Sequence, residues 1–333
     1  MSIALDAMGS DRYPEPELQA AVNASQALGE EIILVGNQEL LEPALKEMNG
    51  DKTKIRIKHA PDVLEMDEHA VEATKQKPNN SMAIGIELVK NGQARAFVTA
   101  GNTGGAYFNA VTQLRRIPGI SRPALTSVIP NKKGRTVFLD TGANADCRPE
   151  FMQEFAVMGS MYAEKVMGIK SPRVGLLANG EEEGKGNELV KNSFPLIKAL
   201  GINFIGNVEP KEVYAGEADV VIADGFTGNI FIKTSEAVAK LITDILKESI
   251  SSSMVSKVGY LLAKPAFSSL KKLLDPAEVG AAILLGVNGY VFIGHGRSDA
   301  RALTNGLMLA QHTADSGFLE ELNVLIQEKL SKS

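Results

Sequence analysis

The sequence predicts an α/β protein in which helices cover both faces of a mainly parallel sheet, that is, a three-layer α/β/α sandwich. Two observations support this prediction. Short runs rich in Ile, Val, Leu and Phe recur along the chain, and segments with helical periodicity separate most of them. Strands that alternate with helices need crossover connections, which pair neighbouring strands in parallel. We expect residues 1–333 to form a single domain.

Each expected strand is a short apolar run. In chain order the runs are SIALDA from Ser2, EIILVG from Glu31, KIRIKHA from Lys54, RAFVTAG from Arg95, RTVFLDTG from Arg135, RVGLLANG from Arg173, INFIGN from Ile202 and DVVIADG from Asp219. A last strand, YVFIGHG from Tyr290, precedes an expected terminal helix from about Asp299 to Lys329. Such runs are too short for core helices and fit strands that are buried on both faces.

Composition narrows the class of protein. With 333 residues and 44% hydrophobic content, the chain can bury a sizeable core. A net charge of -5 argues against a general nucleic-acid binder, because that role needs a basic surface. The single cysteine, Cys147, excludes an internal disulfide and a cysteine-rich zinc site. The start, MSIALDAMGS, has no basic region before a long apolar stretch, so we expect a cytoplasmic protein.

Polar turns that contain glycine follow several of the expected strands. They are Asp6 with Gly9, residues 100–105 (AGNTGG), residues 140–144 (DTGAN), residues 179–187 (NGEEEGKGN) and residues 224–229 (DGFTGN). Glycine lets the backbone approach a ligand, and a helix N-terminus offers free N–H groups to an anion such as phosphate. The same residue types also form ordinary turns and helix caps. Because ligands bind where parallel strands end, we expect these turns to converge on one phosphate pocket.

Several familiar motifs are absent. The chain has neither G-x-G-x-x-G nor G-x-x-x-x-G-K-[ST], so it lacks the dinucleotide fingerprint and the P-loop. It has no G-x-S-x-G elbow, and its four histidines show no metal-ligand spacing. His295 and Arg297 stand together in GHGRSD, directly after the last strand, a pairing that suits phosphate binding or proton transfer. A turn or capping role is the alternative for this segment.

Residues 249–275 form a basic, amphipathic segment in an otherwise acidic chain. Apolar residues recur at helical spacing on both sides of Pro265, which predicts a hairpin of two short helices joined at that proline. One interpretation is an anchor on an anionic membrane surface, with apolar side chains in the acyl boundary and lysines at the lipid heads. The expected membrane-binding residues are Met254, Lys257, Val258, Leu261, Leu262, Phe267, Leu270 and Lys271. Burial against a second subunit is the alternative, and a dimer could do both.

The motifs LDAMGSD, AGNTGG, LDTGAN, GKGNE, NFIGNVE, DGFTGN and GHGRSD occur in this order over essentially the whole chain. Together they closely resemble the bacterial acyl-ACP:phosphate acyltransferases, the PlsX family. The resemblance implies a fold akin to isopropylmalate dehydrogenases and phosphotransacetylases, usually dimeric, and peripheral association with the membrane. It implies transfer of a fatty acyl group from acyl carrier protein to inorganic phosphate, with the acyl phosphate feeding phospholipid synthesis.

The chain departs from the family pattern at two places. The first motif commonly reads DAMGGDHAP, whereas this chain has Ser10, Arg12 and Tyr13 there, so a catalytic histidine at position 12 is excluded. The loop NGEEEGKGN is more acidic than usual, although Lys185 and Asn187 keep their places. This second departure leaves only the fine positioning of the loop open.

The resemblance and the chemistry together suggest site residues. Phosphate is itself the nucleophile, so the protein has to position it, stabilise an oxyanion and help a thiolate leave. We expect Lys185 to neutralise charge, Asp224 with Asp140 to orient groups or move a proton, and His295 to act as the acid for sulfur. The expected phosphate and acyl-phosphate contacts are Asp6, Asn102, Thr103, Gly104, Asn144, Asn187, Thr227, Gly228, Asn229 and Arg297. We expect no cofactor and no metal.

Other functions remain open from the sequence. A phosphotransacetylase acting on a short acyl-CoA would share the turns without needing the lysine-rich hairpin. A dehydrogenase of the related fold would need a nicotinamide site and an aspartate cluster for a metal, neither of which can be assigned. A non-catalytic membrane scaffold for lipid enzymes is a further alternative. The hairpin lysines could also steer acidic acyl carrier protein. We do not expect Cys147 to carry the acyl group, because no histidine lies near it in the sequence.

Overall fold

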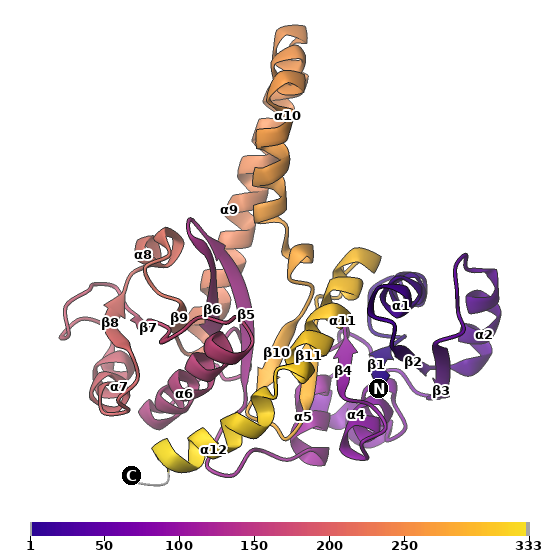
Figure 1. Ribbon diagram of the computed structural model, residues 1–333, viewed down its shortest axis with the longest axis horizontal. Helices are drawn as coiled ribbons and strands as arrows, with labels where there is room; N and C mark the ends of the chain where they lie inside the picture. The colour runs from indigo at the N-terminus through magenta and orange to yellow at the C-terminus, as the bar shows by residue number, and fades with distance from the viewer. Residues whose placement is uncertain (1, 331–333) are drawn as a thin grey trace.

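A central sheet organises the chain (Figure 1). The computed structural model describes residues 2–330, with the side chains of residues 266, 268–274 and 276 outside that description. The strands are β1 (Ser2–Asp6), β2 (Glu31–Gly36), β3 (Ile55–His59), β4 (Ala96–Thr99), β5 (Ala124–Asn131), β6 (Gly134–Leu139), β7 (Val174–Leu177), β8 (Phe204–Val208), β9 (Val220–Ile222), β10 (Ala282–Leu285) and β11 (Tyr290–Ile293). They form one 11-stranded sheet in the order β3-β2-β1-β4-β11-β10-β5-β6-β9-β7-β8. Every strand expected from the sequence is present, and β5 and β10 are additional.

The two additional strands reverse the direction of half the sheet. β10 pairs antiparallel with both β11 and β5, and β5 pairs antiparallel with β6. Consequently β6, β7, β8 and β9 run parallel to one another but opposite to β1, β2, β3, β4 and β11. We call the side where β1, β4 and β11 end the β11 edge, and the side where β6, β7 and β9 end the β9 edge. The polar turns therefore divide between two opposite edges of the sheet.

Helices cover both faces of the sheet. They are α1 (Glu15–Leu28), α2 (Gln38–Glu47), α3 (Ala70–Gln76), α4 (Ser81–Lys90), α5 (Thr103–Gln113), α6 (Pro149–Lys165), α7 (Glu188–Lys198), α8 (Pro210–Ala215), α9 (Gly225–Ser251), α10 (Met254–Leu274), α11 (Ala300–Asp315) and α12 (Phe318–Leu330), with a short 3-10 helix η1 (Pro276–Glu278). Successive strand residues point to opposite faces, so Ile3 and Leu5 join the core beneath α1, α6, α11 and α12, whereas Ala4 joins the core beneath α4 and α5. The three-layer α/β/α prediction is confirmed.

The terminal helix differs from its prediction. The segment expected to run from about Asp299 to Lys329 is divided into α11 and α12 at Ser316 and Gly317. Gly317 has a φ of 65°, a left-handed conformation that ends helices and that glycine adopts without strain. The sequence periodicity continues across this break because both helices bury an apolar stripe against the same core.

An arm of two antiparallel helices projects from the body (Figure 1). The first part of α9 packs on the sheet, where Phe231 stacks on Phe138 with ring centroids 4.9 Å apart. The rest of α9 extends outward, and α10 returns alongside it. The prediction of two short helices joined at Pro265 is wrong, because α10 continues through this residue and packs against α9. Among the described residues, no helix has the length and hydropathy of a membrane-crossing segment.

Candidate active site

Three turns join at the β11 edge. Asp6, at the end of β1, is fully buried, and its carboxylate accepts hydrogen bonds from Thr99 Oγ1 at 2.7 Å and from the Met8 N–H at 3.1 Å. Burial raises the pKa of Asp6, and these donors oppose the rise. The Asp11 N–H donates to the Gly296 carbonyl at 2.7 Å, which ties the turn after β1 to the turn after β11. The turns after β1, β4 and β11 thus form one connected structure.

The N-terminus of α5 presents free donors at this edge. Asn102 caps the helix, since its Oδ1 accepts from the Gly105 N–H at 2.9 Å. Its Nδ2 donates to the carbonyls of residues 65, 66 and 68, which fixes the cap in place. Thr103 and Gly104 are exposed, and within residues 2–330 their N–H groups have no hydrogen-bond acceptor. Two free N–H groups at a helix N-terminus suit an anion.

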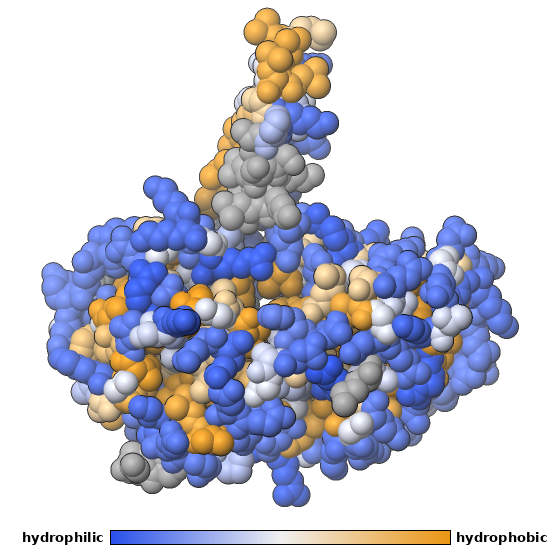
Figure 2. Space-filling model, viewed as in Figure 1, coloured by the Kyte–Doolittle hydropathy of each residue, from blue (hydrophilic) through white to orange (hydrophobic). Residues whose placement is uncertain are grey.

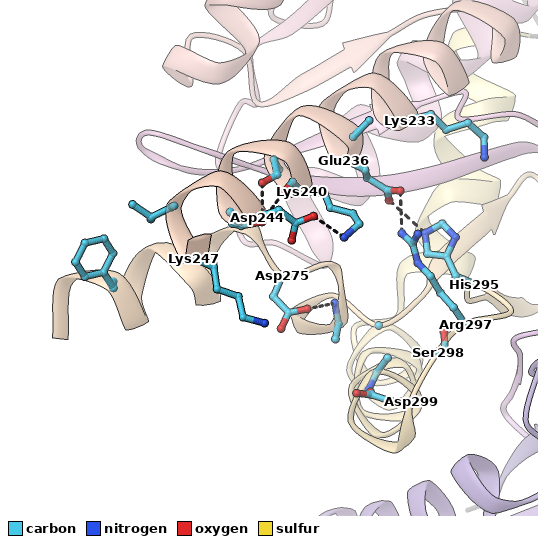
Figure 3. Close-up of a pocket in the computed structure, with 18 of the residues that line it drawn as sticks. Lys233, Glu236, Lys240, Asp244, Lys247, Asp275, His295, Arg297, Ser298 and Asp299 are labelled. Atoms are coloured by element: carbon cyan, nitrogen blue, oxygen red, sulfur yellow. Dashed lines mark hydrogen bonds and ion pairs between the residues drawn. The ribbon is translucent and has the colours of Figure 1, made fainter. Parts of the chain in front are cut away.

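Basic side chains lie beside these turns. His295 and Arg297 follow β11, and both contact Glu236 on α9, with Nε2 of His295 at 3.5 Å and Nη2 of Arg297 at 3.0 Å from its carboxylate (Figure 3). The His295 hydrogen bond, reinforced by Arg297, lowers the pKa of Glu236. Lys233 and Lys240 lie on the same helix near this pair, and Lys240 bonds Asp244 at 2.8 Å.

A groove of about 1080 Å³ opens next to these residues, between the arm and the body. Its lining comes from α9, α10, η1 and the turn after β11. His295, Arg297 and Glu236 stand at one end, and Tyr260 and Phe267 of the arm stand at the other. Ligand sites are commonly concave, and this groove combines charged side chains with apolar and aromatic ones.

The turn at residues 224–229 lies at the β9 edge and has few free donors. The Gly225 N–H donates to the Asn144 carbonyl at 2.8 Å, and the Thr227 N–H donates to Asp224 Oδ1 at 2.9 Å. Asp224 also accepts from the Thr227 hydroxyl at 2.7 Å. A Cβ on Gly228 would lie 1.9 Å from the Asp140 carbonyl oxygen, so this glycine permits the close packing of α9 on the turn after β6. The capping role that the sequence left open accounts for Asp224, and close packing against the turn after β6 accounts for Gly225 and Gly228.

Asp140 and Asn144 hold their own turn together. Asp140 is fully buried and accepts from the N–H groups of Leu125, Gly142, Ala143 and Asn144 and from Asn144 Nδ2. Burial raises the pKa of Asp140, and these donors oppose the rise. The Asn144 amide also donates to the Pro123 carbonyl at 2.7 Å. The Asp140 carboxylate and the Asn144 side-chain nitrogen are thus occupied within the protein, while Asn229 lies against Gly142.

The remaining expected residues also lie at the β9 edge. Lys185 is exposed in the loop after β7, and Asn187 caps α7 by accepting from the Val190 N–H at 2.9 Å. From Gly225 to Glu236, α9 rises about 16 Å. Lys185 and Asp224 at one edge and His295 at the other therefore do not meet at one centre within a single chain. The expectation of one convergent pocket is wrong, because β5 and β10 reverse the second half of the sheet.

One acidic cluster exists in the described part of the chain. Carboxylate oxygens of Glu181, Glu209 and Glu212 lie within 4.8 Å of one another. Lys211 Nζ lies 2.9 Å, 2.8 Å and 3.7 Å from these three side chains. The hydrogen bonds to Glu209 and Glu181 raise the pKa of Lys211. The ammonium group thus supplies the positive charge that a metal ion would otherwise bring.

Comparisons with known proteins give the family. The family model described as "fatty acid synthesis protein" matches residues 1–321. The chain is 47% identical over 321 residues to the phosphate acyltransferase of Acidobacterium capsulatum, covering 96% of this chain and 95% of the relative, and 44% identical over 329 residues to that of Elusimicrobium minutum, covering 98% and 96%. A phosphotransacetylase from Streptococcus pyogenes shares the fold, with a TM-score of 0.61, 19% identity and coverage of 95% and 94% of the two chains. The chain therefore belongs to the fatty acid synthesis protein family, the PlsX-type phosphate acyltransferases that its motifs resemble.

Proposed function

We propose that this chain transfers a fatty acyl group from the thiol of acyl carrier protein to inorganic phosphate, and that the acyl phosphate feeds phospholipid synthesis. Membership in the family supports the reaction. The observation that carries the assignment of the site is the pair of free N–H groups on Thr103 and Gly104 beside the turn that bears His295 and Arg297. The turn after β11 also borders an amphiphile-sized groove, and an anion site beside such a groove suits a phosphate nucleophile and a fatty thioester.

The reaction needs few steps from the protein. A phosphate oxygen attacks the thioester carbonyl, a C–O bond forms, the C–S bond breaks, and the departing sulfur takes a proton. In our proposal the N–H groups of Thr103 and Gly104 hold phosphate, Arg297 neutralises its charge, and His295 donates the proton to sulfur. Glu236 orients both basic side chains. Fixed donors of this kind act without reorganisation during the reaction.

The residues of the β9 edge take a different role in this proposal. Asp140, Asn144, Asp224 and Gly228 hold the turns after β6 and β9 together through the contacts described above. Four other residues of this edge remain proposed substrate contacts, namely Lys185, Asn187, Thr227 and Asn229. They would contact a substrate at a place separate from His295. Replacing Lys185 with Met and measuring the KM for each substrate tests this, since a change in neither constant would remove Lys185 from the substrate contacts.

We also propose that the arm serves two surfaces. Val238, Leu241, Ile242 and Ile245 recur at helical spacing on α9 and are 48%, 58%, 53% and 54% exposed, as expected of a face that pairs with a second copy. Figure 2 shows apolar side chains gathered at the outer end of the arm. Among the side chains of α10 that the structure describes, the large exposed apolar ones are Met254, Val255, Val258, Leu261 and Leu262. Such an end suits peripheral contact with a membrane.

The membrane proposal has a direct test. Lys257 and Lys264 are exposed on α10, and Phe267 is partly buried, whereas the side chains of Leu270 and Lys271 lie outside the described residues. Each lysine near an anionic surface contributes about 1 kcal/mol to binding. The double change Lys257→Glu and Lys264→Glu should release the protein from vesicles that contain anionic lipid. Undiminished co-sedimentation with those vesicles would rule out the anchor.

One assay separates the main alternatives. The protein is incubated with phosphate and either palmitoyl carrier protein or acetyl-CoA, and acyl phosphate is trapped with hydroxylamine. Product from the carrier protein alone supports our proposal, product from acetyl-CoA alone makes the chain a phosphotransacetylase, and no product from either leaves a scaffold role. One observation favours the hypothesis that the chain is a phosphotransacetylase, namely the fold that it shares with the Streptococcus pyogenes protein.

A further inference from the structure

The groove between the arm and the body has two chemically different ends (Figure 3). The end at the sheet carries Glu236, His295 and Arg297. The far end is lined by Leu246 and Ile250 of α9 and by Tyr260 and Phe267 of α10, whose rings lie 5.2 Å apart. α9 lines the groove along its whole length, and Asp275, Ala277, Gly280, Asp299 and Ala302 line it from the body. A ligand that fits both ends has to be an amphiphile.

The length of the groove limits the kind of amphiphile. Glu236 and Ile250 both face the groove from α9, and the rise between them is about 21 Å. This span matches an extended fatty acyl chain and exceeds what a short acyl group needs. A volume of about 1080 Å³ is also at the large end for small-molecule sites.

The charges along the groove favour an anionic head group. Its acids already have partners, since Glu236 binds Arg297 at 3.0 Å, Asp244 binds Lys240 at 2.8 Å, and Asp275 pairs with Arg301. Asp299 is occupied as the N-cap of α11. Lys233 and Lys247 also line the groove, and neither has an ion-pair partner among the residues that the structure describes. The two ammonium groups lie about 21 Å apart along α9, so Lys233 stands near the end that carries Glu236 and Arg297, whereas Lys247 lies next to Leu246 at the far end.

We propose that this groove holds the fatty acyl chain of the substrate and of the acyl phosphate product, with the anionic head at Lys233 and Arg297 and the methyl end between Leu246 and Tyr260. This inference rests on the proposed function, because it assigns a place to the acyl chain of that reaction. It also sets chain-length preference in the arm, so that a longer chain gains affinity by reaching further along α9. Each methylene removed from water favours binding about fourfold.

The test changes the apolar end and measures a ratio. In Leu246→Glu, a carboxylate stands where the chain would lie, and losing two buried methylenes alone lowers affinity about 15-fold. We expect the ratio of kcat/KM for palmitoyl to butyryl carrier protein to fall more than tenfold. The matched control is Val324→Glu, an apolar-to-glutamate change at a 59% exposed site on α12, away from the groove. It should leave the ratio as in the unchanged protein.

Further measurements separate the possible failures. Ala239 lines the groove about 4.5 Å beyond Glu236 along α9, so Ala239→Phe should obstruct chains that extend past this point and shorten the preferred chain even if Leu246→Glu folds poorly. An unchanged ratio in folded Leu246→Glu and in Ala239→Phe overturns the groove proposal. If the kcat/KM ratio is unchanged and these variants become monomers in sedimentation, a second copy of the chain fills the groove. That result also overturns the proposal that the acyl chain lies there. If the unchanged protein forms no acyl phosphate from either substrate, the proposed function itself fails.

Discussion

Replacing Thr103 with proline removes one N–H group from the anion site with little disturbance of the fold. Thr103 is the first residue of α5, a position at which proline is favourable because its fixed φ suits the helix and the missing N–H has no intrahelical partner. The preceding Asn102 has φ -55° and ψ 111°, close to the extended conformation that a residue before proline requires. The cap from Asn102 Oδ1 to the Gly105 N–H is independent of position 103.

The expected loss follows from the bond that disappears. A hydrogen bond to a charged group contributes about 1.5–3 kcal/mol, which corresponds to about a 10- to 150-fold change in affinity. We expect kcat/KM for phosphate to fall by that factor in Thr103→Pro, and the KM for palmitoyl carrier protein to stay constant. Thr103→Ala keeps the N–H and removes the hydroxyl, so the ratio between the two variants reports the N–H contribution.

The matched control is Glu188→Pro. Glu188 is the first residue of α7, follows the capping residue Asn187, and belongs to the β9 edge. Initial rates over a phosphate series, with thermal unfolding of each variant, separate binding from stability. A fall of kcat/KM for phosphate in Glu188→Pro, with no change in Thr103→Pro, would refute the reasoning and move the anion site to the β9 edge.

Two further predictions concern stability. Glu17 is fully buried, and its Oε1 accepts from the Ser10 N–H at 2.9 Å. Desolvation raises the pKa of Glu17 to about 7. Between its pKa in the unfolded chain and about 7, the folded state therefore holds more protons than the unfolded state, so the free energy of unfolding falls as pH rises. The difference in free energy of unfolding between Glu17→Gln and the unchanged protein should therefore shift in favour of the variant by up to about 3 kcal/mol when the pH is raised from about 5 to about 8. Urea midpoints measure this difference, and parallel pH profiles of the two proteins would contradict the prediction. Gly228→Ala should lower the free energy of unfolding by more than about 3 kcal/mol, because the new Cβ would lie 1.9 Å from the Asp140 carbonyl oxygen. Gly259→Ala on α10 meets open space and should raise it by about 1 kcal/mol. Equal urea midpoints for the two variants would refute this packing argument.

Sequence reasoning identified the strands whose signal is a continuous apolar run, and it failed where that signal weakens. β5 interrupts its apolar residues with polar Thr126 and Ser127 and contains Pro130, so it lacks the apolar run by which the other strands were recognised. β10 is a run of four residues in a glycine-rich segment. Both strands pair antiparallel with both of their neighbours, so missing them also hid the reversal of half the sheet. The error about a single convergent pocket follows from that omission.

The candidate site was predictable only in part, because a local pattern does not reveal which donors are already occupied. The turns at residues 100–105 and 224–229 have similar composition, and both cap a helix. At the second turn the Asn144 carbonyl, far away in the sequence, takes the Gly225 N–H. Glu236 was likewise invisible as a site residue, since only the packing of the turn after β11 against α9 brings His295 and Arg297 to it.

The reversal of the sheet also explains why the anion site and the arm are neighbours. A helix that follows a strand runs back along the sheet, so α9 leaves the β9 edge and returns toward the β11 edge. With 27 residues it extends about 40 Å, far more than strands of three to eight residues need, and its second half must project beyond the sheet. Because β9 runs opposite to β11, that projection begins where the turn after β11 carries His295 and Arg297. Had both halves of the sheet run in one direction, the arm would emerge at the far edge, away from the free N–H groups of α5.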